Sequence, residues 1–187
     1  MVALTFDLGG TTAGSTAHVL DTLKAYKYRA TFFLTGQWTA ANPALVKRMA
    51  AEGHELANHT YSHPNLTEIS PDKIKSEIWT TEAAIVKASG TLPSWLLRPP
   101  FGAYDPTVRI VLGELGYDLV FWSVDSGDWQ GLTSSQIVKR VDERVGAGDV
   151  VVFHAYAENT GQAIGGVCET LRTKHLTGGT LSQALGR

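Results

Sequence analysis

Two histidines, His59 and His63, stand four residues apart, directly after a short apolar segment that ends at Asn58. Imidazole nitrogens are common ligands of divalent metals, and residues four apart on a helical turn face the same side. This histidine pair therefore predicts a metal site at the end of the segment. The alternative is coincidence, because two histidines at this spacing often occur without binding a metal.

A carboxylate, Asp7, follows the apolar run 2–6. An ionised carboxylate at such a position is costly unless it is paired or takes part in chemistry. Arg98, which lies between Leu97 and two prolines, is the expected partner, because its guanidinium would fix Asp7 and keep it charged. The alternative is a purely structural ion pair.

A third candidate, His154, follows the most apolar segment of the chain, 149–153. An imidazole there could act as an acid, and Asp125 is the candidate to orient it and raise its pKa. The alternative is a hydrogen-bonded core histidine. Aromatic side chains near the same segment ends are expected either to wall a substrate pocket or to fill the core: Phe101, Trp122 and Trp129.

Strand-like and helix-like segments alternate along the whole chain and must position these residues. The strand-like segments are 2–6, 30–34, 55–58, 96–97, 119–124, 149–153 and, weakly, 176–181. The helical patterns are 15–26, 43–51, 71–88, 106–115, 134–145 and 162–173. This alternation predicts an α/β domain with parallel strands. Because 187 residues is short for an eight-unit barrel of roughly 250, we expect one distorted, incompletely closed (β/α)7 barrel. Its strand ends would bring the candidates together.

Composition excludes several classes of protein. The chain has 187 residues, 43% hydrophobic and 18% charged, with a net charge of −2, as in an ordinary globular domain. No basic field favours nucleic acid or an anionic membrane, and no apolar run reaches the roughly 20 residues of a membrane span. The single cysteine, Cys168, cannot form an intrachain disulfide. We expect no nucleic-acid partner and no membrane insertion of this segment, and a monomer is favoured.

Five segments in order resemble the motifs of one family, the polysaccharide deacetylases of carbohydrate esterase family 4, whose catalytic unit is the NodB-type homology domain. The segments are 5–7 (TFD), 59–63 (HTYSH), 98–102 (RPPFG), 125–129 (DSGDW) and 151–154 (VVFH). The resemblance covers essentially the whole chain, 1–187, as a single catalytic domain. It implies a distorted (β/α) barrel and one divalent metal ion, usually zinc, with cobalt or another divalent ion as alternatives. The implied substrates are N-acetylglucosamine polymers or acetylated xylan.

The resemblance also implies a role for each candidate. It makes Asp7 the base, the histidine pair the metal ligands and His154 the acid, with Arg98 orienting Asp7 and Asp125 tuning His154. The metal would activate a water and polarise the acetyl carbonyl while Asp7 takes a proton. A backbone N–H near Phe101 would stabilise the oxyanion, and His154 would protonate the leaving amine.

One residue departs from the family pattern. The first motif of the family carries two successive aspartates, the second of which is a metal ligand, and Leu8 stands at that position here. Two histidines alone would give a weaker and more open site than the three protein ligands of a catalytic zinc. The candidates to complete the shell are Asp7, Asp128, Thr11 or Thr12, and extra waters.

We therefore expect a metal-dependent hydrolase that removes N-acetyl, or alternatively O-acetyl, groups from polysaccharides such as peptidoglycan or chitin-type oligomers. One alternative is a catalytically impaired pseudoenzyme that binds carbohydrate, because of Leu8. Another is a hydrolase of small amides or imides on the same fold. The polymeric substrates imply an extracellular or cell-envelope location, with any signal or anchor upstream of this segment.

Overall fold

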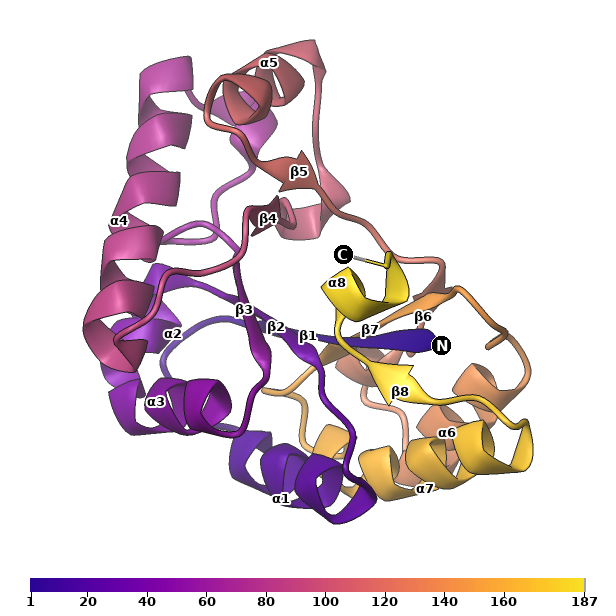
Figure 1. Cartoon of the computed structure of the whole chain (residues 1–187). Helices are drawn as coiled ribbons and strands as arrows, with labels where there is room; N and C mark the ends of the chain where they lie inside the picture. Colours follow the sequence, from indigo (N-terminus) through magenta and orange to yellow (C-terminus); the bar gives the residue numbers. More distant parts are fainter. Residues whose placement is uncertain (187) are drawn as a thin grey trace.

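Short parallel strands curl into an open barrel with helices packed around its outside, as the computed structural model of residues 1–186 shows (Figure 1). The strands are β1 (Val2–Leu8), β2 (Thr31–Leu34), β3 (Glu55–Asn58), β4 (Leu96–Leu97), β5 (Asp118–Leu119), β6 (Val124–Asp125), β7 (Val150–His154) and β8 (Gly178–Gly179). Their hydrogen-bonded order is β5-β4-β3-β2-β1-β7-β6, and β8 pairs with the start of β1. The expected parallel, incompletely closed (β/α)7 barrel is confirmed, with its opening between β5 and β6.

Helices follow most strands and begin and end at residues suited to their termini. The α-helices are α1 (Thr16–Tyr26), α2 (Gly36–Ala41), α3 (Pro43–Ala51), α4 (Pro71–Ser89), α5 (Pro106–Glu114), α6 (Ser134–Asp142), α7 (Thr160–Thr173) and α8 (Leu181–Ala184). Three short 3-10 turns are η1 (Leu66–Glu68), η2 (Pro100–Gly102) and η3 (Asp128–Gln130). The longest helix, α4, begins after Ser70, whose hydroxyl accepts from Lys73 N–H, and ends at Gly90 in the left-handed conformation.

The structure corrects two expected strands. The segment 119–124 is not one strand, because Val120 N–H bonds to Leu97 O on one edge of the sheet and Ser123 N–H bonds to Val150 O on the other. The chain therefore crosses the opening of the barrel here instead of pairing along it. The expected last strand, 176–181, shrinks to the two residues of β8, and α8 begins at Leu181.

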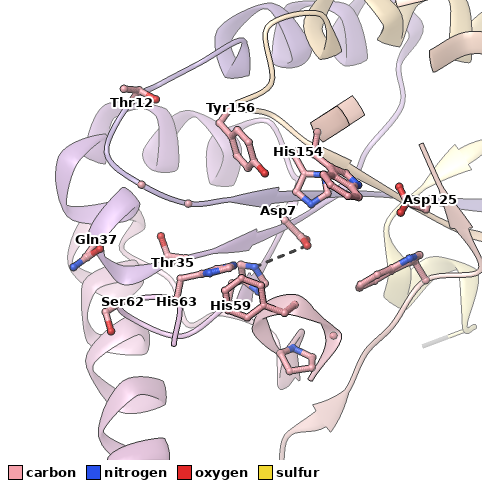
Figure 2. A pocket seen from close by; sticks show the side chains of 17 residues that line it. Asp7, Thr12, Thr35, Gln37, His59, Ser62, His63, Asp125, His154 and Tyr156 are labelled. Carbon is pink, nitrogen blue, oxygen red and sulfur yellow. Dashed lines mark ion pairs between the residues drawn. The ribbon is translucent and has the colours of Figure 1, made fainter. Parts of the chain in front are cut away.

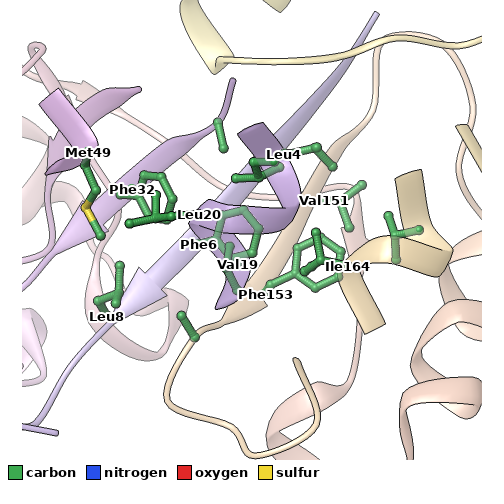
Figure 3. Close-up of a cluster of buried hydrophobic side chains, with 14 of the residues drawn as sticks. Leu4, Phe6, Leu8, Val19, Leu20, Phe32, Met49, Val151, Phe153 and Ile164 are labelled. Carbon is green, nitrogen blue, oxygen red and sulfur yellow. The ribbon is translucent and has the colours of Figure 1, made fainter. Parts of the chain in front are cut away.

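The main hydrophobic core lies between the sheet and the outer helices (Figure 3). Alternate side chains of a strand point to opposite faces, and on β1 the residues Leu4, Phe6 and Leu8 enter this core. Phe6 stacks between Phe32 and Phe153 of the neighbouring strands, with ring centroids 5.2 Å and 5.3 Å away. The intervening residues of β1 therefore face the inside of the barrel.

The register of the parallel strands decides which polar residues lie next to each other. Asp7 pairs with Phe33 of β2 and with His154 of β7 at the carboxyl end of the sheet. Asn58 of β3 pairs with Leu97 of β4, which places His59 and Arg98 next to each other. Across residues 1–186, no helix combines the length and apolarity needed to cross a membrane.

Candidate active site

A cavity of about 860 Å³ opens at the carboxyl ends of β1, β3 and β7 (Figure 2). This volume is typical of small-molecule and substrate sites. It is lined by eight of the nine residues singled out from the sequence: Asp7, His59, His63, Phe101, Trp122, Asp125, Trp129 and His154. The ninth, Arg98, is fully buried and contacts Asp7.

The contact expected between Asp7 and Arg98 is present. Nη1 of Arg98 donates to Oδ1 of Asp7 at 2.7 Å, and Nη2 donates to the carbonyl of Phe121 at 3.1 Å. The guanidinium also lies 4.2 Å from the ring centre of Phe33. Burial would raise the pKa of Asp7, but the charge and hydrogen bond of Arg98 outweigh it and hold that pKa below its usual value. Asp7 is therefore an ionised carboxylate at neutral pH.

His59 is fixed with one ring nitrogen free. Its Nδ1 lies 2.7 Å from the carbonyl oxygen of Arg98, which can only accept, so Nδ1 carries the proton. Nε2 then has a free lone pair and lies 3.9 Å from Oδ2 of Asp7. Burial lowers the pKa of His59 to about 4, so the ring is neutral at pH 7. A neutral imidazole oriented through its other nitrogen is the form that binds metals.

The loop that carries the histidine pair differs from the expected helical turn. Thr60 and His63 adopt the left-handed conformation, with φ of 66° and 61°. The two imidazoles nevertheless lie side by side, with ring centroids 4.9 Å apart and an interplanar angle of 71°. The ring of Phe101 packs edge-on against His63 at 4.8 Å. The imidazoles of His59 and His63 are brought together by a strained loop and not by the periodicity of a helix.

His154 is oriented by Asp128. Nδ1 of His154 lies 2.9 Å from Oδ1 of Asp128, and the backbone N–H of His154 donates to Oδ2 at 2.6 Å. Thr160 Oγ1 also donates to Oδ2 at 2.7 Å. The Asp128 carboxylate is 2% exposed, so these contacts hold it in one geometry.

Asp128, and not the expected Asp125, makes the hydrogen bond to the ring of His154. Asp125 ends β6, and its Oδ1 instead accepts from the N–H of Gly127 at 2.7 Å, which closes the turn into η3. Burial would lower the pKa of His154, but the hydrogen bond to Asp128 and the charges of Asp7, Asp128 and Asp125 raise it. Asp125 thus acts on His154 only through space.

Aromatic side chains form the exposed rim of the cavity. Phe101 is 72% exposed, Trp129 53% and Tyr156 47%, which is unusual for large rings without a ligand surface. Sequence reasoning missed Tyr156, whose ring lies 5.5 Å from that of His154. Its only signal in the sequence is its position two residues after His154.

The side chains at the cavity supply only some of the ligands that a divalent metal needs. Leu8 is 1% exposed and packs in the main core, on the opposite face of β1 from Asp7. Asp128 is committed to His154 and Thr160, so it is not a free ligand. Within residues 1–186, no three side chains of His, Cys, Asp or Glu are grouped closely enough to hold a metal ion. The site therefore holds two adjacent imidazoles but, among the described residues, no third ligand grouped with them.

Comparison with known sequences identifies related proteins. A sequence profile described as polysaccharide deacetylase matches residues 1–120. The peptidoglycan-N-acetylglucosamine deacetylase of Listeria monocytogenes is 33% identical over 185 residues, which are 99% of this chain and 39% of the relative. The peptidoglycan-N-acetylglucosamine deacetylase of Bacillus cereus is 36% identical over 177 residues, 92% of this chain and 64% of the relative. The chain thus spans less than two thirds of each of these relatives.

Solved structures include both enzymes and a pseudoenzyme of this fold. A family 4 carbohydrate esterase from Streptomyces lividans, in complex with acetate, is 40% identical with a TM-score of 0.90, covering 100% of this chain and 95% of that one. A CE4 family pseudoenzyme from Bacillus anthracis is 26% identical with a TM-score of 0.91, covering 99% of this chain and 65% of that one. Similarity of fold therefore does not separate an active enzyme from an inactive one.

Proposed function

Since the chain belongs to the polysaccharide deacetylase family, carbohydrate esterase family 4, we propose that residues 1–187 act as one catalytic domain that hydrolyses N-acetyl groups of a polysaccharide. The names of its relatives favour peptidoglycan or chitin-type oligomers, because they include a chitooligosaccharide deacetylase of Bradyrhizobium, 37% identical over 153 residues. Such substrates favour action at the cell envelope. The observation that carries the proposal is the pairing of an ionised carboxylate, Asp7, with an acidic imidazole, His154, at one register of adjacent strands.

Asp7 acts as the general base. Its Oδ1 is held by Arg98, and its Oδ2 lies 3.9 Å from Nε2 of His59, which also lines the cavity. One oxygen is therefore oriented, and the other can take the proton of an attacking water. Because its pKa is held below the usual value, Asp7 is fully ionised at neutral pH. Arg98 therefore positions the base and keeps it charged.

His154 acts as the general acid. Asp128 holds Nδ1, which leaves Nε2 as the nitrogen that can protonate the leaving amine. Amide hydrolysis needs this proton, because an amine anion is a very poor leaving group. The raised pKa of His154 keeps a larger fraction of the ring protonated near neutral pH.

Binding of the sugar and of the oxyanion falls to the rim. The exposed faces of Phe101, Trp129 and Tyr156 suit stacking against pyranose rings, and the backbone N–H of Phe101 is the donor proposed for the oxyanion. The half-buried Trp122 completes the aromatic wall beside Arg98.

His59 and His63 would hold a divalent metal ion, for which their neutral imidazoles favour zinc. When bound, such an ion polarises a carbonyl and lowers the pKa of a water. Because Leu8 supplies no third ligand, we propose that the affinity for metal is low.

A second candidate function follows from the same residue. With Leu8 in place of a ligand, the chain would bind the polysaccharide on its aromatic rim and not hydrolyse it. The pseudoenzyme from Bacillus anthracis shows that this fold also occurs in an inactive protein.

Acetate release from N-acetylglucosamine oligomers distinguishes the two. The protein is first treated with a chelator and then assayed with stoichiometric and with excess zinc or cobalt. A deacetylase gives metal-dependent acetate, and Asp7→Asn, which removes the base, lowers the rate by about 10²- to 10⁴-fold. Asp142→Asn, on the exposed outer side of α6, is the matched control and keeps full activity.

A pseudoenzyme releases no acetate at any metal concentration but still binds the oligomers, as calorimetry would show. Leu8→Asp, compared in the same assay, tests whether a carboxylate at position 8 restores turnover. Absence of both turnover and oligomer binding would contradict both functions.

A further inference from the structure

We propose that Glu77 is a positioning residue, whose buried carboxylate on α4 holds the loop 59–63 so that the imidazoles of His59 and His63 stay side by side in the cavity. The role of these two imidazoles in holding a metal ion rests on the proposed function. The placement of the loop does not depend on that function.

Glu77 lies in the middle of α4 with only 3% of its surface exposed. Glutamate is almost never buried to this degree unless it is paired. Its Oε2 accepts from the backbone N–H groups of Tyr61 and Ser62, both at 2.8 Å, and its Oε1 accepts from Ser62 Oγ at 3.0 Å. Three of its contacts therefore go to the two residues midway between the histidines.

The charge of Glu77 strengthens this contact. Burial would raise its pKa, but the hydrogen bonds from Ser62, Lys73 and Tyr61 outweigh burial and hold that pKa below its usual value. Hydrogen bonds to an ionised acceptor are roughly twice as strong as those between neutral groups. Lys73, one turn earlier on α4, lies 3.3 Å from Oε1 and supports the same charge.

The loop needs an external restraint because its conformation is strained. Thr60 and His63 both lie in the left-handed region, which costs on the order of 1 kcal/mol or more for each such non-glycine residue. The N–H groups of Gly36 and Gln37, at the start of α2, also donate to the carbonyls of Thr60 and Tyr61, each at 3.0 Å. The loop is thus held by its carbonyls from α2 and by its N–H groups from α4.

A second feature fixes the α2 side of the loop. The ring of Tyr61 packs directly on Gly36, where an added Cβ would lie 2.0 Å from the ring. This contact allows no shift of the loop toward α2. Glu77 holds the N–H groups of the loop, and within residues 1–186 no other side chain accepts from those of Tyr61 and Ser62.

The two histidines depend on this loop to different degrees. His59 is also fixed by the carbonyl of Arg98, whereas the ring of His63 is placed by packing against His59 and Phe101. His63 therefore relies most on the backbone that Glu77 holds. Because Leu8 supplies no third ligand, any ion at this site would depend on how closely the two rings are aligned.

Three variants test the proposal. Glu77→Met keeps the length of the side chain and removes both acceptors. Glu77→Gln keeps one oxygen for the N–H groups of Tyr61 and Ser62, and its amide can donate to Ser62 Oγ. The matched control is Glu114→Met, which makes the same substitution at an exposed carboxylate of α5 that pairs with Lys75 of α4 at 2.7 Å.

Two measurements are made on the intact chain. The first records the ¹H–¹⁵N signals of the histidine rings in chelator-treated protein, and the second determines the dissociation constant for Co²⁺ by titration. In Glu77→Met we expect shifted ring signals for His63 and a loss of Co²⁺ affinity of about tenfold or more, the range for residues that orient metal ligands. Glu77→Gln should lie close to the unmodified protein, and Glu114→Met should match it in both measurements.

Unchanged ring signals in a folded Glu77→Met variant would overturn the proposal. If that variant does not fold, Glu77→Asp takes its place, because it keeps the charge but withdraws the carboxylate from the loop by one methylene. Failure of the proposed function is distinguishable, since the unmodified protein would then bind no Co²⁺ and release no acetate. The ring signals would still decide the role of Glu77 in that case.

Discussion

Removing Arg98 should destabilise the fold and change the pKa of Asp7 from lowered to raised. Arg98 is 0% exposed and Asp7 5%, so their ion pair is shielded from solvent. Arg98→Met retains apolar bulk against Phe33 but leaves the Asp7 carboxylate buried without its partner. Breaking a buried pair in this way costs about 3–5 kcal/mol at neutral pH.

The expected shift in melting temperature follows from chain length. For a domain of 150–250 residues, 1 kcal/mol corresponds to roughly 2–4 °C, so Arg98→Met should lower Tm by about 6–20 °C. Asp7→Ala leaves the guanidinium unpaired and should cost a similar amount. The double variant removes both charges. Its loss of unfolding free energy should be smaller, by about 2 kcal/mol or more, than the sum of the losses in the two single variants.

The pH dependence gives the sharper test. In the unmodified protein the pKa of Asp7 is lowered, so its contribution is present above pH 4 and is lost as pH falls through the folded pKa. In Arg98→Met, burial dominates and raises the pKa of Asp7, so protonation relieves the buried charge. The difference in unfolding free energy between the two proteins should therefore be largest at pH 7 and shrink toward pH 4.

Urea unfolding at several pH values, followed by circular dichroism, measures this difference. His54, whose neighbouring charges are Glu52, Arg29 and Arg48, is present in both proteins and cancels. A difference below about 1 kcal/mol at pH 7, or one that stays constant down to pH 4, would refute the buried ion pair as the source of the ionised base.

Two further predictions concern histidines. Asp128→Asn removes the negative charge that helps to raise the pKa of His154 and leaves one acceptor oxygen in place of two. The protonated form of His154 is then lost at lower pH, so the basic limb of kcat/KM should move down, with activity reduced by about 10- to 100-fold. An unmoved limb in a pH–rate profile would contradict this role. The pKa of His54 is lowered to about 4 by burial, so the unfolded chain takes up a proton that the folded chain does not, and stability falls by about 2 kcal/mol between pH 7 and pH 5. His54→Gln, which keeps an acceptor for the N–H of Ala30, should remove that loss in urea unfolding, and an unchanged loss would show that another group causes it.

The elements and site residues could be predicted from the sequence where local signals agree with the tertiary contacts. Ser70, Pro71 and Gly90 mark both ends of α4, and apolar runs mark β1 and β7. Parallel strands place the residues that follow them at one rim, so eight residues of the cavity lining could be predicted from the sequence. Asp7 and Arg98 could be paired because each would be costly to bury alone.

Contacts set by short loops and by the opening of the barrel could not be predicted. Asp125 and Asp128 are both acidic and three residues apart, and only the turn through Gly127 decides that the second one meets His154. The crossing at 120–123 looks like a strand because its residues are apolar, yet it spans two edges of the sheet. Glu77 lies in a helix with many charged residues, and nothing in its local pattern distinguishes it from them.

The position of Leu8 explains how the site can lack a ligand and keep its other contacts. Along β1 the side chain of Leu8 lies on the core face, whereas Asp7 faces the cavity. A buried leucine at this place contributes about 1.5–3 kcal/mol to stability, and a carboxylate there is costly unless it is paired or bound to a metal. The buried leucine at position 8 thus contributes to the stability of the fold, at the place where the family pattern has a carboxylate. Leu8 takes no part in the hydrogen bonds that join Asp7 to Arg98 and His154 to Asp128, so the proposed base and the proposed acid keep their partners with leucine at position 8.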